Sequence, residues 1–217
     1  MLRRFYHVVD NFYENADEVR LCALNRSFSL SEGVTGWRTS AFHPTGIKNR
    51  IEQRFRVKIK YWERDLNASE ACNGVFLSAF SQGKRAERVG VHYDEPVHWM
   101  MFLIYLNPEA PRDAGTSFWE HRETGLVCRP TKRDEERLRV PIAELNKVLL
   151  LDSIIRNRWR EIDRISNFYN RAVMFPAGLL HSATRHFGNS LSNGRLYQSF
   201  HFPICRVAHL MTQAISF

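Results

Sequence analysis

Short runs that alternate between apolar and polar residues, or that are almost wholly apolar, occupy most of the chain after residue 56. Alternating runs predict strands with one buried face, whereas the apolar run Trp99–Leu106 (WMMFLIYL) predicts a strand buried on both faces. Gly, Pro, Asn and Asp separate the runs, which is typical of a β-sandwich or barrel. The expected strands are Phe5–Phe12, Val57–Glu63, Val75–Gln82, Glu87–Asp94, Trp99–Leu106, Thr116–His121, Arg171–Pro176 and Arg195–Pro203.

Apolar residues follow a helical spacing in two segments near the start of the chain. Residues 15–28 (NADEVRLCALNRSF) predict an amphipathic helix with Asn15 or Asp17 near its N-cap. Residues 47–55 predict a short second helix. The polar, glycine-containing stretch between these two segments predicts a loop.

The β pattern is interrupted at about residues 131–160. This segment is charged at first and then apolar at helical spacing, which predicts an insert with at least one helix that starts near Pro141. The residues that follow, 159–168, fit a helix or a strand, and we favour a strand. A chain of 217 residues suits one domain and buries a core without disulfides. We therefore expect one mainly β domain over residues 1–217, with flanking helices and this insert.

The net charge of the chain is +8, carried by 25 Arg and 6 Lys against 23 acidic residues. Basicity of this size favours anionic partners such as nucleic acid, acidic metabolites or phosphorylated substrates. A basic surface without a specific partner explains the same charge equally well. The charge alone therefore does not choose between these classes of partner.

The cysteines and the apolar runs indicate the compartment. The four cysteines are Cys22, Cys72, Cys128 and Cys205. They show no CxxC spacing, so a zinc or thioredoxin-type motif is unsupported, and scattered free thiols are typical of a reducing compartment. No apolar run approaches the roughly 18 residues that a membrane helix needs. Asp10, Glu14 and Asp17 argue against an N-terminal targeting signal. We expect a cytoplasmic protein without a membrane partner.

The string VGVHYDEPVHWMMFLIYLN carries the most informative polar residues. His92 and Asp94 are two positions apart, so on a strand both side chains point to the same face. His181 follows a predicted strand and a turn. Two histidines and one carboxylate form the facial triad of non-haem Fe(II) oxygenases, which keeps coordination positions open for other ligands. Arg195 lies in a later strand, and its planar fork suits the distal carboxylate of 2-oxoglutarate.

This order of residues in a β-rich chain is similar to that of the Fe(II)- and 2-oxoglutarate-dependent dioxygenases. The string YLN at 105–107, followed by Gly115, Thr116 and Phe118, resembles the YLN…GGxTxF stretch of the prolyl-hydroxylase branch. RAVMFPAGLLH resembles the strand–turn–histidine segment of the family, and VVDNFYENADEVR resembles its N-terminal segment. The similarity covers about residues 87–121 and 171–203, and it points to a small bacterial subgroup.

The resemblance implies a double-stranded β-helix, which is a jelly-roll or cupin-like barrel. It also implies that His92, Asp94 and His181 bind Fe(II), with 2-oxoglutarate as cosubstrate and O2 as the oxidant. Arg195 would hold the distal carboxylate of 2-oxoglutarate, and the Tyr105 hydroxyl would reach the same group. No catalytic residue beyond the metal ligands is implied. The presence of Asp94 favours hydroxylation over halogenation, because halogenase relatives carry a small residue there.

Some points stay open at this stage. A buried tyrosine needs a hydrogen-bond partner, and for Tyr105 a cosubstrate carboxylate and a backbone group are equally consistent. Ser199 shares strand parity with Arg195. His121 fits a buried, hydrogen-bonded residue without a metal role. The Gly-Gly pair of the prolyl-hydroxylase branch is Ala114-Gly115 here, which leaves the branch open.

The expected function is hydroxylation of a small molecule, amino acid or peptide, with release of succinate and CO2. One alternative is an oxidative nucleic-acid demethylase of the same superfamily, which the basic charge supports. The tail RLYQSFH resembles the RxNxTxR signature of that branch but ends in His201 instead of arginine. Another alternative is a metal-binding jelly roll that is not an oxygenase. The oligomeric state is open.

Overall fold

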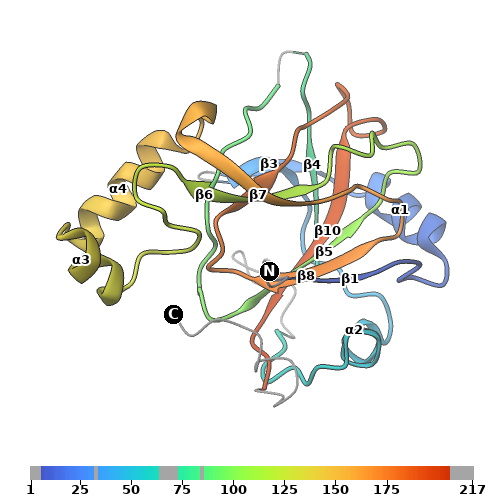
Figure 1. Ribbon diagram of the computed structural model, residues 1–217. Helices are drawn as coiled ribbons and strands as arrows, with labels where there is room; N and C mark the ends of the chain where they lie inside the picture. Colours follow the sequence, from blue (N-terminus) through green and yellow to red (C-terminus); the bar gives the residue numbers. More distant parts are fainter. Residues whose placement is uncertain (1–5, 32–33, 64–72, 84–85, 206–217) are drawn as a thin grey trace.

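The computed structural model describes residues 6–31, 34–63, 73–83 and 86–205. Within these ranges the strands form one sheet of seven and one sheet of three (Figure 1). Four α-helices and one 3-10 helix complete the described elements. The predicted class, mainly β with flanking helices, is confirmed for this part of the chain. No helix in the described ranges is long and apolar enough to cross a lipid bilayer.

The larger sheet is antiparallel throughout and contains the central apolar strand. Its order is β1 (His7–Val9), β8 (Ala172–Pro176), β5 (Met100–Tyr105), β10 (Arg195–Phe202), β4 (Val75–Ala79), β3 (Val34–Arg38) and β2 (Ser29–Ser31). Every β5 residue after Met100 is buried, as its apolar run predicts. The long strand β10 pairs with β5 on one side and with β4 on the other.

The smaller sheet carries the distal histidine on an edge strand. It consists of β7 (Trp159–Ile165), β6 (Thr116–His121) and β9 (His181–Ala183), in that order and antiparallel. The register between β6 and β7 shifts between Phe118 and Trp119, which marks a β-bulge. Phe118 lies opposite His181, so the two side chains share one face of this sheet. The strand that we favoured for residues 159–168 is confirmed as β7.

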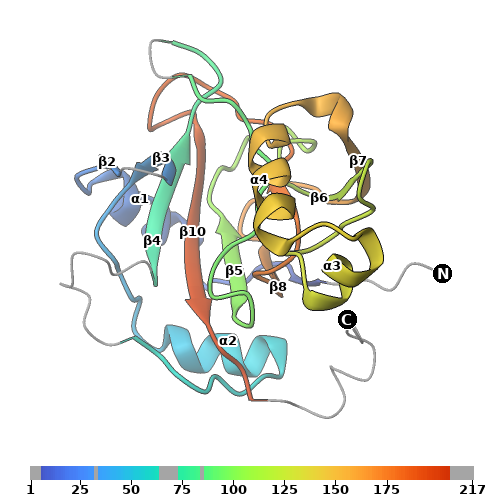
Figure 2. The same cartoon turned by 90° about the vertical axis from the view of Figure 1, so that its left-hand side faces the viewer.

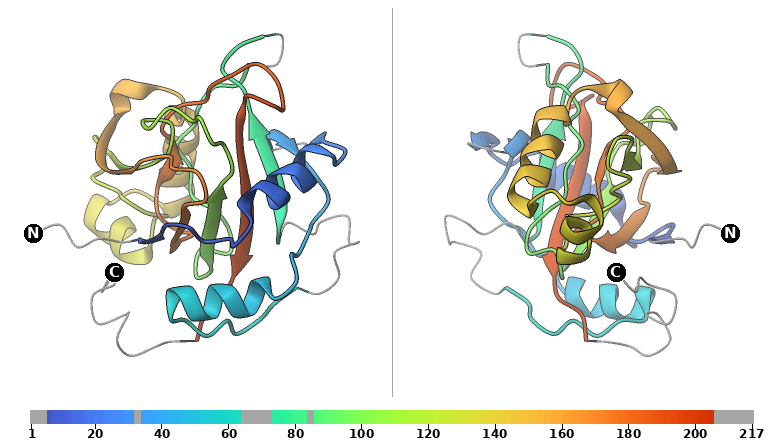
Figure 3. Two further views of the ribbon diagram at one scale, coloured as in Figure 1. Left: turned by 90° about the vertical axis from the view of Figure 1, so that its right-hand side faces the viewer. Right: turned by 60° about the vertical axis from the view of Figure 1, so that its left-hand side comes forward.

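The helices pack on two different sides of the molecule (Figures 1 and 3). They are α1 (Ala16–Leu24), α2 (Ile47–Phe55), α3 (Lys132–Leu138) and α4 (Ile142–Asp152), and the 3-10 helix η1 spans Arg156–Arg158. The side chain of Asn15 accepts a hydrogen bond from the Glu18 amide, so Asn15 is the N-cap of α1, as predicted. Pro141 directly precedes α4, which confirms the predicted start of a helix there.

Strands β5 and β10 separate two apolar layers. Phe102 and Phe200 face one side, where they pack in one cluster with apolar residues of α1 and α2. Leu103 and Tyr105 alternate with these residues and face the smaller sheet, where Phe118 joins their cluster. Figure 2 shows the two sheets beside each other, with α4 next to the smaller one. The layer between the sheets is where the polar residues of interest meet.

Helix α4 covers the outer face of the smaller sheet. Leu145 and Leu149 are one turn apart and pack in the same cluster as Trp119 and Trp159. At the end of α4, Asp152 accepts a hydrogen bond from the buried ring of His121 at 3.0 Å. This contact confirms the prediction of a buried, hydrogen-bonded His121.

Two expected strands are wrong. In residues 57–63 only Ile59 forms a β-bridge, to Ile204, and in residues 87–94 only His92 does, to His181. Val57 and Ile59 are buried, so their alternation correctly reported one buried face. An alternating pattern indicates which side chains are buried. It does not show whether the backbone pairs with another strand, because a β-ladder also needs a neighbouring strand along its length.

The loop expected between the first two helices is also wrong in part. It contains β2 and β3, which form the edge of the larger sheet next to β4. Strand β2 (SLS) is the edge strand and β3 (VTGWR) is its short neighbour, and neither is long enough to show a clear alternation of apolar and polar residues. Strand β9 was missed because its three residues are too few to show a period.

Candidate metal centre

His92, Asp94 and His181 converge between the two sheets. Each offers a ligand atom, and these three atoms lie within 4.8 Å of one another. The carboxylate lies between the imidazoles, with Oδ1 at 3.8 Å from Nε2 of His92 and Oδ2 at 3.2 Å from Nε2 of His181. The structure therefore brings together the three residues that the sequence analysis selected.

The backbone places the two histidines directly opposite each other. The amide of His92 donates to the carbonyl of His181 at 3.0 Å, and the amide of His181 donates to the carbonyl of His92 at 2.8 Å. The amide of Asp94 donates to the Ala177 carbonyl at 2.9 Å. These three bonds fix the segment 92–94 against the turn before β9, although this segment is not part of a ladder.

Both imidazoles are oriented by backbone carbonyls. Nδ1 of His181 lies 2.8 Å from the Leu179 carbonyl, and Nδ1 of His92 lies 3.0 Å from the Gly90 carbonyl. A carbonyl only accepts, so Nδ1 must carry the proton in each ring. A neutral ring in this tautomer presents the lone pair of Nε2, which is the form that binds a metal ion.

Asp94 provides a test of whether the site fits a metal ion. Its Oδ2 atom is buried and makes no hydrogen bond to any residue that the structure describes. When His181 is neutral in this tautomer, its Nε2 holds a lone pair, and two electron-rich atoms then point at each other at 3.2 Å. A divalent cation between them would remove this repulsion, and imidazole with carboxylate is a donor set that iron accepts. The residues present therefore fit the group.

The pKa values of the site favour the same protonation states. Burial alone would raise the pKa of Asp94, but a hydrogen bond and positive charge from His181 when it is protonated, followed by the charges of His92 and His201, outweigh burial and hold the pKa below its ordinary value. Partial burial, followed by the charge of His181, lowers the pKa of His92. Carboxylate and neutral imidazole are the forms that coordinate a metal ion, and these directions favour them at Asp94 and His92.

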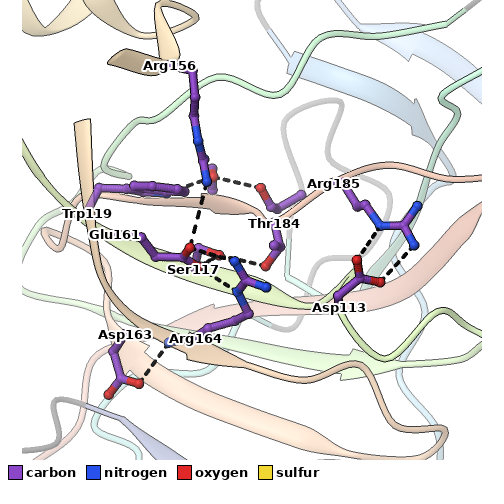
Figure 4. A network of polar contacts seen from close by, with 11 residues as sticks. Asp113, Ser117, Trp119, Arg156, Glu161, Asp163, Arg164, Thr184 and Arg185 are labelled. Carbon is purple, nitrogen blue, oxygen red and sulfur yellow. Dashed lines mark hydrogen bonds and ion pairs between the residues drawn. The ribbon is translucent and has the colours of Figure 1, made fainter. Parts of the chain in front are cut away.

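The outer face of the smaller sheet supports the strand that carries His181. The indole Nε1 of Trp119 donates to Ser182 Oγ at 2.9 Å. Next to it, the fully buried Ser117 hydroxyl lies 2.6 Å from both Thr184 Oγ1 and Glu161 Oε1 (Figure 4). These bonds join β9 to β6 and β7 behind the ligand. Such outer contacts hold a ligand in place without touching the metal.

Arg195 lies in the same layer, on β10, and is only 3% exposed. Its guanidinium donates to the carbonyls of Ala114 and Gly115 at 3.3 and 3.2 Å and lies over the ring of Tyr197. No carboxylate among the described residues forms an ion pair with it. A buried cation with only neutral partners is costly and calls for an anion from outside the chain.

The hydroxyl of Tyr105 has a partner that the sequence did not indicate. It lies 2.7 Å from the Thr116 hydroxyl, which is neither a backbone group nor the cosubstrate. Tyr105 lies opposite Tyr197 in the sheet register, beside Arg195. The backbone at Gly115 passes close to the backbone of Ile165. A Cβ atom at this position would lie 1.8 Å from the Ile165 carbonyl oxygen, so only glycine fits here.

Sequence reasoning missed two residues on the same face of β10. Arg195, Tyr197, Ser199 and His201 alternate along the strand and share one face. Burial lowers the pKa of His201, and the charges of Asp94 and His181 also act on it, so His201 lies within electrostatic reach of the metal ligands. The alternation that placed Ser199 on the same face as Arg195 places Tyr197 and His201 there as well. Both residues could therefore have been predicted once residues 195–203 were assigned as a strand.

The chain belongs to DUF6445, a family of unknown function whose model matches residues 3–200. No curated protein matches the chain in sequence.

Solved structures share the fold. HygX from Streptomyces hygroscopicus, solved with nickel and 2-oxoglutarate bound, is 10% identical, with a TM-score of 0.55 over 93% of this chain and 83% of its own. SnoN, a non-haem α-ketoglutarate-dependent epimerase from nogalamycin biosynthesis, is 14% identical, with a TM-score of 0.53 over 93% of this chain and 79% of its own. At this identity the likeness establishes the fold, and the resemblance to this enzyme class is confirmed at that level.

Proposed function

We propose that the chain is an Fe(II)- and 2-oxoglutarate-dependent oxygenase that hydroxylates a small molecule, amino acid or peptide. The observation that carries the proposal is the presence of two complementary groups in one layer. One is the His92–Asp94–His181 cluster, whose donor atoms suit a divalent cation, and the other is the buried Arg195, which donates to neutral carbonyl groups. A divalent iron and a dicarboxylate would match both.

Each residue then has a defined task. His92, Asp94 and His181 would hold the iron on one side and leave coordination positions for the cosubstrate and O2. Iron bound with 2-oxoglutarate supplies the activation of O2, with succinate and CO2 as coproducts. Arg195 would bind the distal carboxylate and fix the direction of the cosubstrate. The apolar side chains around it, such as Leu103 and Phe175, exclude water from this layer.

Hydroxylation is the outcome that we propose because Asp94 occupies the position that a halide would need. The related structures support a small substrate, since HygX was also solved with hygromycin B bound. SnoN is an epimerase, so the same fold serves more than one reaction outcome.

We also propose that the two sheets are the halves of a double-stranded β-helix and that residues 1–217 form one domain. The family model, which spans residues 3–200, supports the single domain.

The first test measures the iron–cosubstrate complex directly. Metal-free protein receives Fe(II) and 2-oxoglutarate without oxygen, and the weak visible charge-transfer band of the chelate is recorded. We expect the band in wild type and its loss in His181→Ala. In Arg195→Ala the band should require about tenfold or more 2-oxoglutarate, because a buried charge-assisted contact is lost.

Arg185→Ala is the matched control for this experiment. Arg185 is exposed and pairs with Asp113 at 2.7 Å, so its removal should leave the band and its 2-oxoglutarate dependence unchanged. Absence of the band in folded wild-type protein that binds iron would sink the cosubstrate assignment. The chain would then be a metal-binding jelly roll of another function, and formation of succinate would be absent as well.

We do not extend the proposal to a nucleic-acid substrate. Much of the basic charge is already neutralised by ion pairs, including Arg160–Glu120, Arg164–Glu161 and Arg171–Asp10. A base would need an exposed aromatic ring to stack on, and Trp119 is only 1% exposed. Binding to a single-stranded oligonucleotide that weakens steeply with salt would reopen this alternative.

A further inference from the structure

A cavity of about 400 Å³ lies beside the metal centre, where several segments of the chain meet. Val97 enters it from the loop after Asp94, and Leu179 enters from the turn before His181. The opposite wall is formed by residues 128–132 and by Ile142 at the start of α4. None of the three metal ligands lines the cavity.

The walls of this cavity are largely apolar. The apolar lining residues are Val97, Pro130, Ile142, Pro176 and Leu179. Cys128 adds a thiol, and burial with the nearby Asp134 raises its pKa to about 11. The thiol is therefore neutral and a weak hydrogen-bond donor at physiological pH.

The charged groups at the rim are already paired within the chain. Arg129 lies 3.2 Å from Glu95, and Lys132 lies 2.8 Å from Glu135. The Thr131 hydroxyl, a third polar group of the lining, donates to Asp134 at 2.6 Å. An ionised ligand would have to compete with a carboxylate for either cation, whereas an uncharged ligand disturbs none of these pairs.

We propose that this cavity binds a small uncharged apolar molecule, separate from the cosubstrate. Its volume lies in the range of small-molecule sites, which are mostly lined by apolar side chains. Water in such a cavity finds few free polar partners, so an apolar occupant displaces it favourably. The proposal does not rest on the oxygenase assignment, because the cavity is complete without metal or cosubstrate.

An occupant would also contact both segments that carry metal ligands. Leu179 is part of the wall, and its carbonyl accepts the Nδ1 proton of His181. Val97 lies three residues after Asp94. The cavity wall therefore includes residues that lie within three positions of Asp94 and of His181.

The test uses metal-free full-length protein and two matched fluorescent probes. N-phenyl-1-naphthylamine is uncharged, and 8-anilino-1-naphthalenesulfonate carries the same ring system with a sulfonate. We expect saturable binding of the uncharged probe at one site per chain and an affinity for the sulfonate that is lower by about tenfold or more. Tighter binding of the sulfonate would overturn the proposed ligand class.

Variants place the probe within the chain. Ile142→Trp fills the cavity from α4, and Val97→Phe fills it from the opposite wall, so each should weaken probe binding by about tenfold or more. The control is the double variant Leu150→Ser/Leu151→Ser on the same helix, where both leucines are exposed, at 74% and 64%. Loss of binding in this control, with normal binding in folded cavity variants, would overturn the proposal.

A chemical readout reports the location independently of fluorescence. Alkylation of Cys128 by iodoacetamide is followed by peptide mass spectrometry, and the bound probe should slow it by about fivefold or more. Cys22 and Cys205 serve as internal controls, since neither lines the cavity. An unchanged rate at Cys128 under saturating probe would place the probe elsewhere and refute the site.

Discussion

The hydroxyls of Tyr105 and Thr116 depend on each other in the buried layer between the sheets. They lie 2.7 Å apart, and both residues are at most 1% exposed, so neither group finds water if the other is removed. Loss of one partner leaves a buried polar group unpaired, whereas loss of both leaves an apolar contact. This asymmetry allows a structural role of Tyr105 to be separated from a role in cosubstrate binding.

At this scale we predict the outcome of a double-mutant cycle in metal-free protein. Tyr105→Phe and Thr116→Val should each lower the free energy of unfolding by about 1–3 kcal/mol. The double variant should lose less than the sum, because no unpaired group remains. Urea unfolding measures all three values. Strict additivity would show that the two hydroxyls do not share one bond.

The same variants test the role implied by the family resemblance. If Thr116 is the functional partner of Tyr105, Tyr105→Phe leaves the 2-oxoglutarate dependence of the charge-transfer band unchanged. If the hydroxyl turns to the cosubstrate instead, the variant requires about threefold to tenfold more 2-oxoglutarate. Arg195→Ala provides the reference for a full loss of this contact.

At the scale of elements, one buried contact connects α4 to the smaller sheet. His121 is fully buried, with Thr124 on Nδ1 at 2.9 Å and Asp152 on Nε2 at 3.0 Å. We predict that Asp152→Ala lowers the free energy of unfolding by about 2–3 kcal/mol, because it leaves a buried ring nitrogen unpaired. Thermal or urea unfolding provides the measurement.

Glu144→Ala is the matched control on the same helix. Glu144 pairs with Lys147 at 3.8 Å on the exposed face, so its removal should cost at most about 0.5 kcal/mol. Equal losses of unfolding free energy in the two variants would mean that the hydrogen bond between His121 and Asp152 does not account for the effect of Asp152→Ala.

The elements that could be predicted from the sequence are those that bury much apolar surface. Strand β5 and helix α4 show their periods clearly because Phe102 and Leu149 pack in apolar clusters. Strands β2, β3 and β9 could not be predicted, since each has at most five residues, too few to show a period. Pairing of residues far apart in the chain, such as His92 with His181, leaves no local pattern.

The candidate site could be predicted further than the fold around it. His92, Asp94 and His181 were selected through strand parity and family resemblance, and the structure brings them together. The partner of Tyr105 could not be predicted, because the approach of β5 to β6 depends on tertiary packing. The cavity lined by Cys128 was equally invisible, since its walls come from separate segments.

The stability of the whole molecule should depend on pH through His186. This residue is 8% exposed, and burial, followed by the charge of Arg195, lowers its pKa to about 4. In the unfolded chain the ordinary value of about 6.5 returns. As pH falls from about 6.5 to about 4, His186 therefore becomes protonated in the unfolded state but stays neutral in the folded state. The free energy of unfolding decreases over this range.

We predict that His186→Gln reduces this loss by about 3 kcal/mol over that pH window, which corresponds to one proton. Urea unfolding at several pH values between about 4 and 7 measures the slope in metal-free protein. His98→Gln is the control, because His98 is exposed. An unchanged slope in His186→Gln would assign the pH dependence to other groups.

The reciprocal backbone bonds between His92 and His181 also bear on how the molecule is made. They join two segments separated by about two fifths of the chain, so the closure of this long loop precedes assembly of the centre. A nascent chain on the ribosome carries His92 and Asp94 early but lacks the third donor until residue 181 emerges. Loading of the proposed metal centre would then follow synthesis of residue 181, and a chain that ends before this residue would lack the third donor.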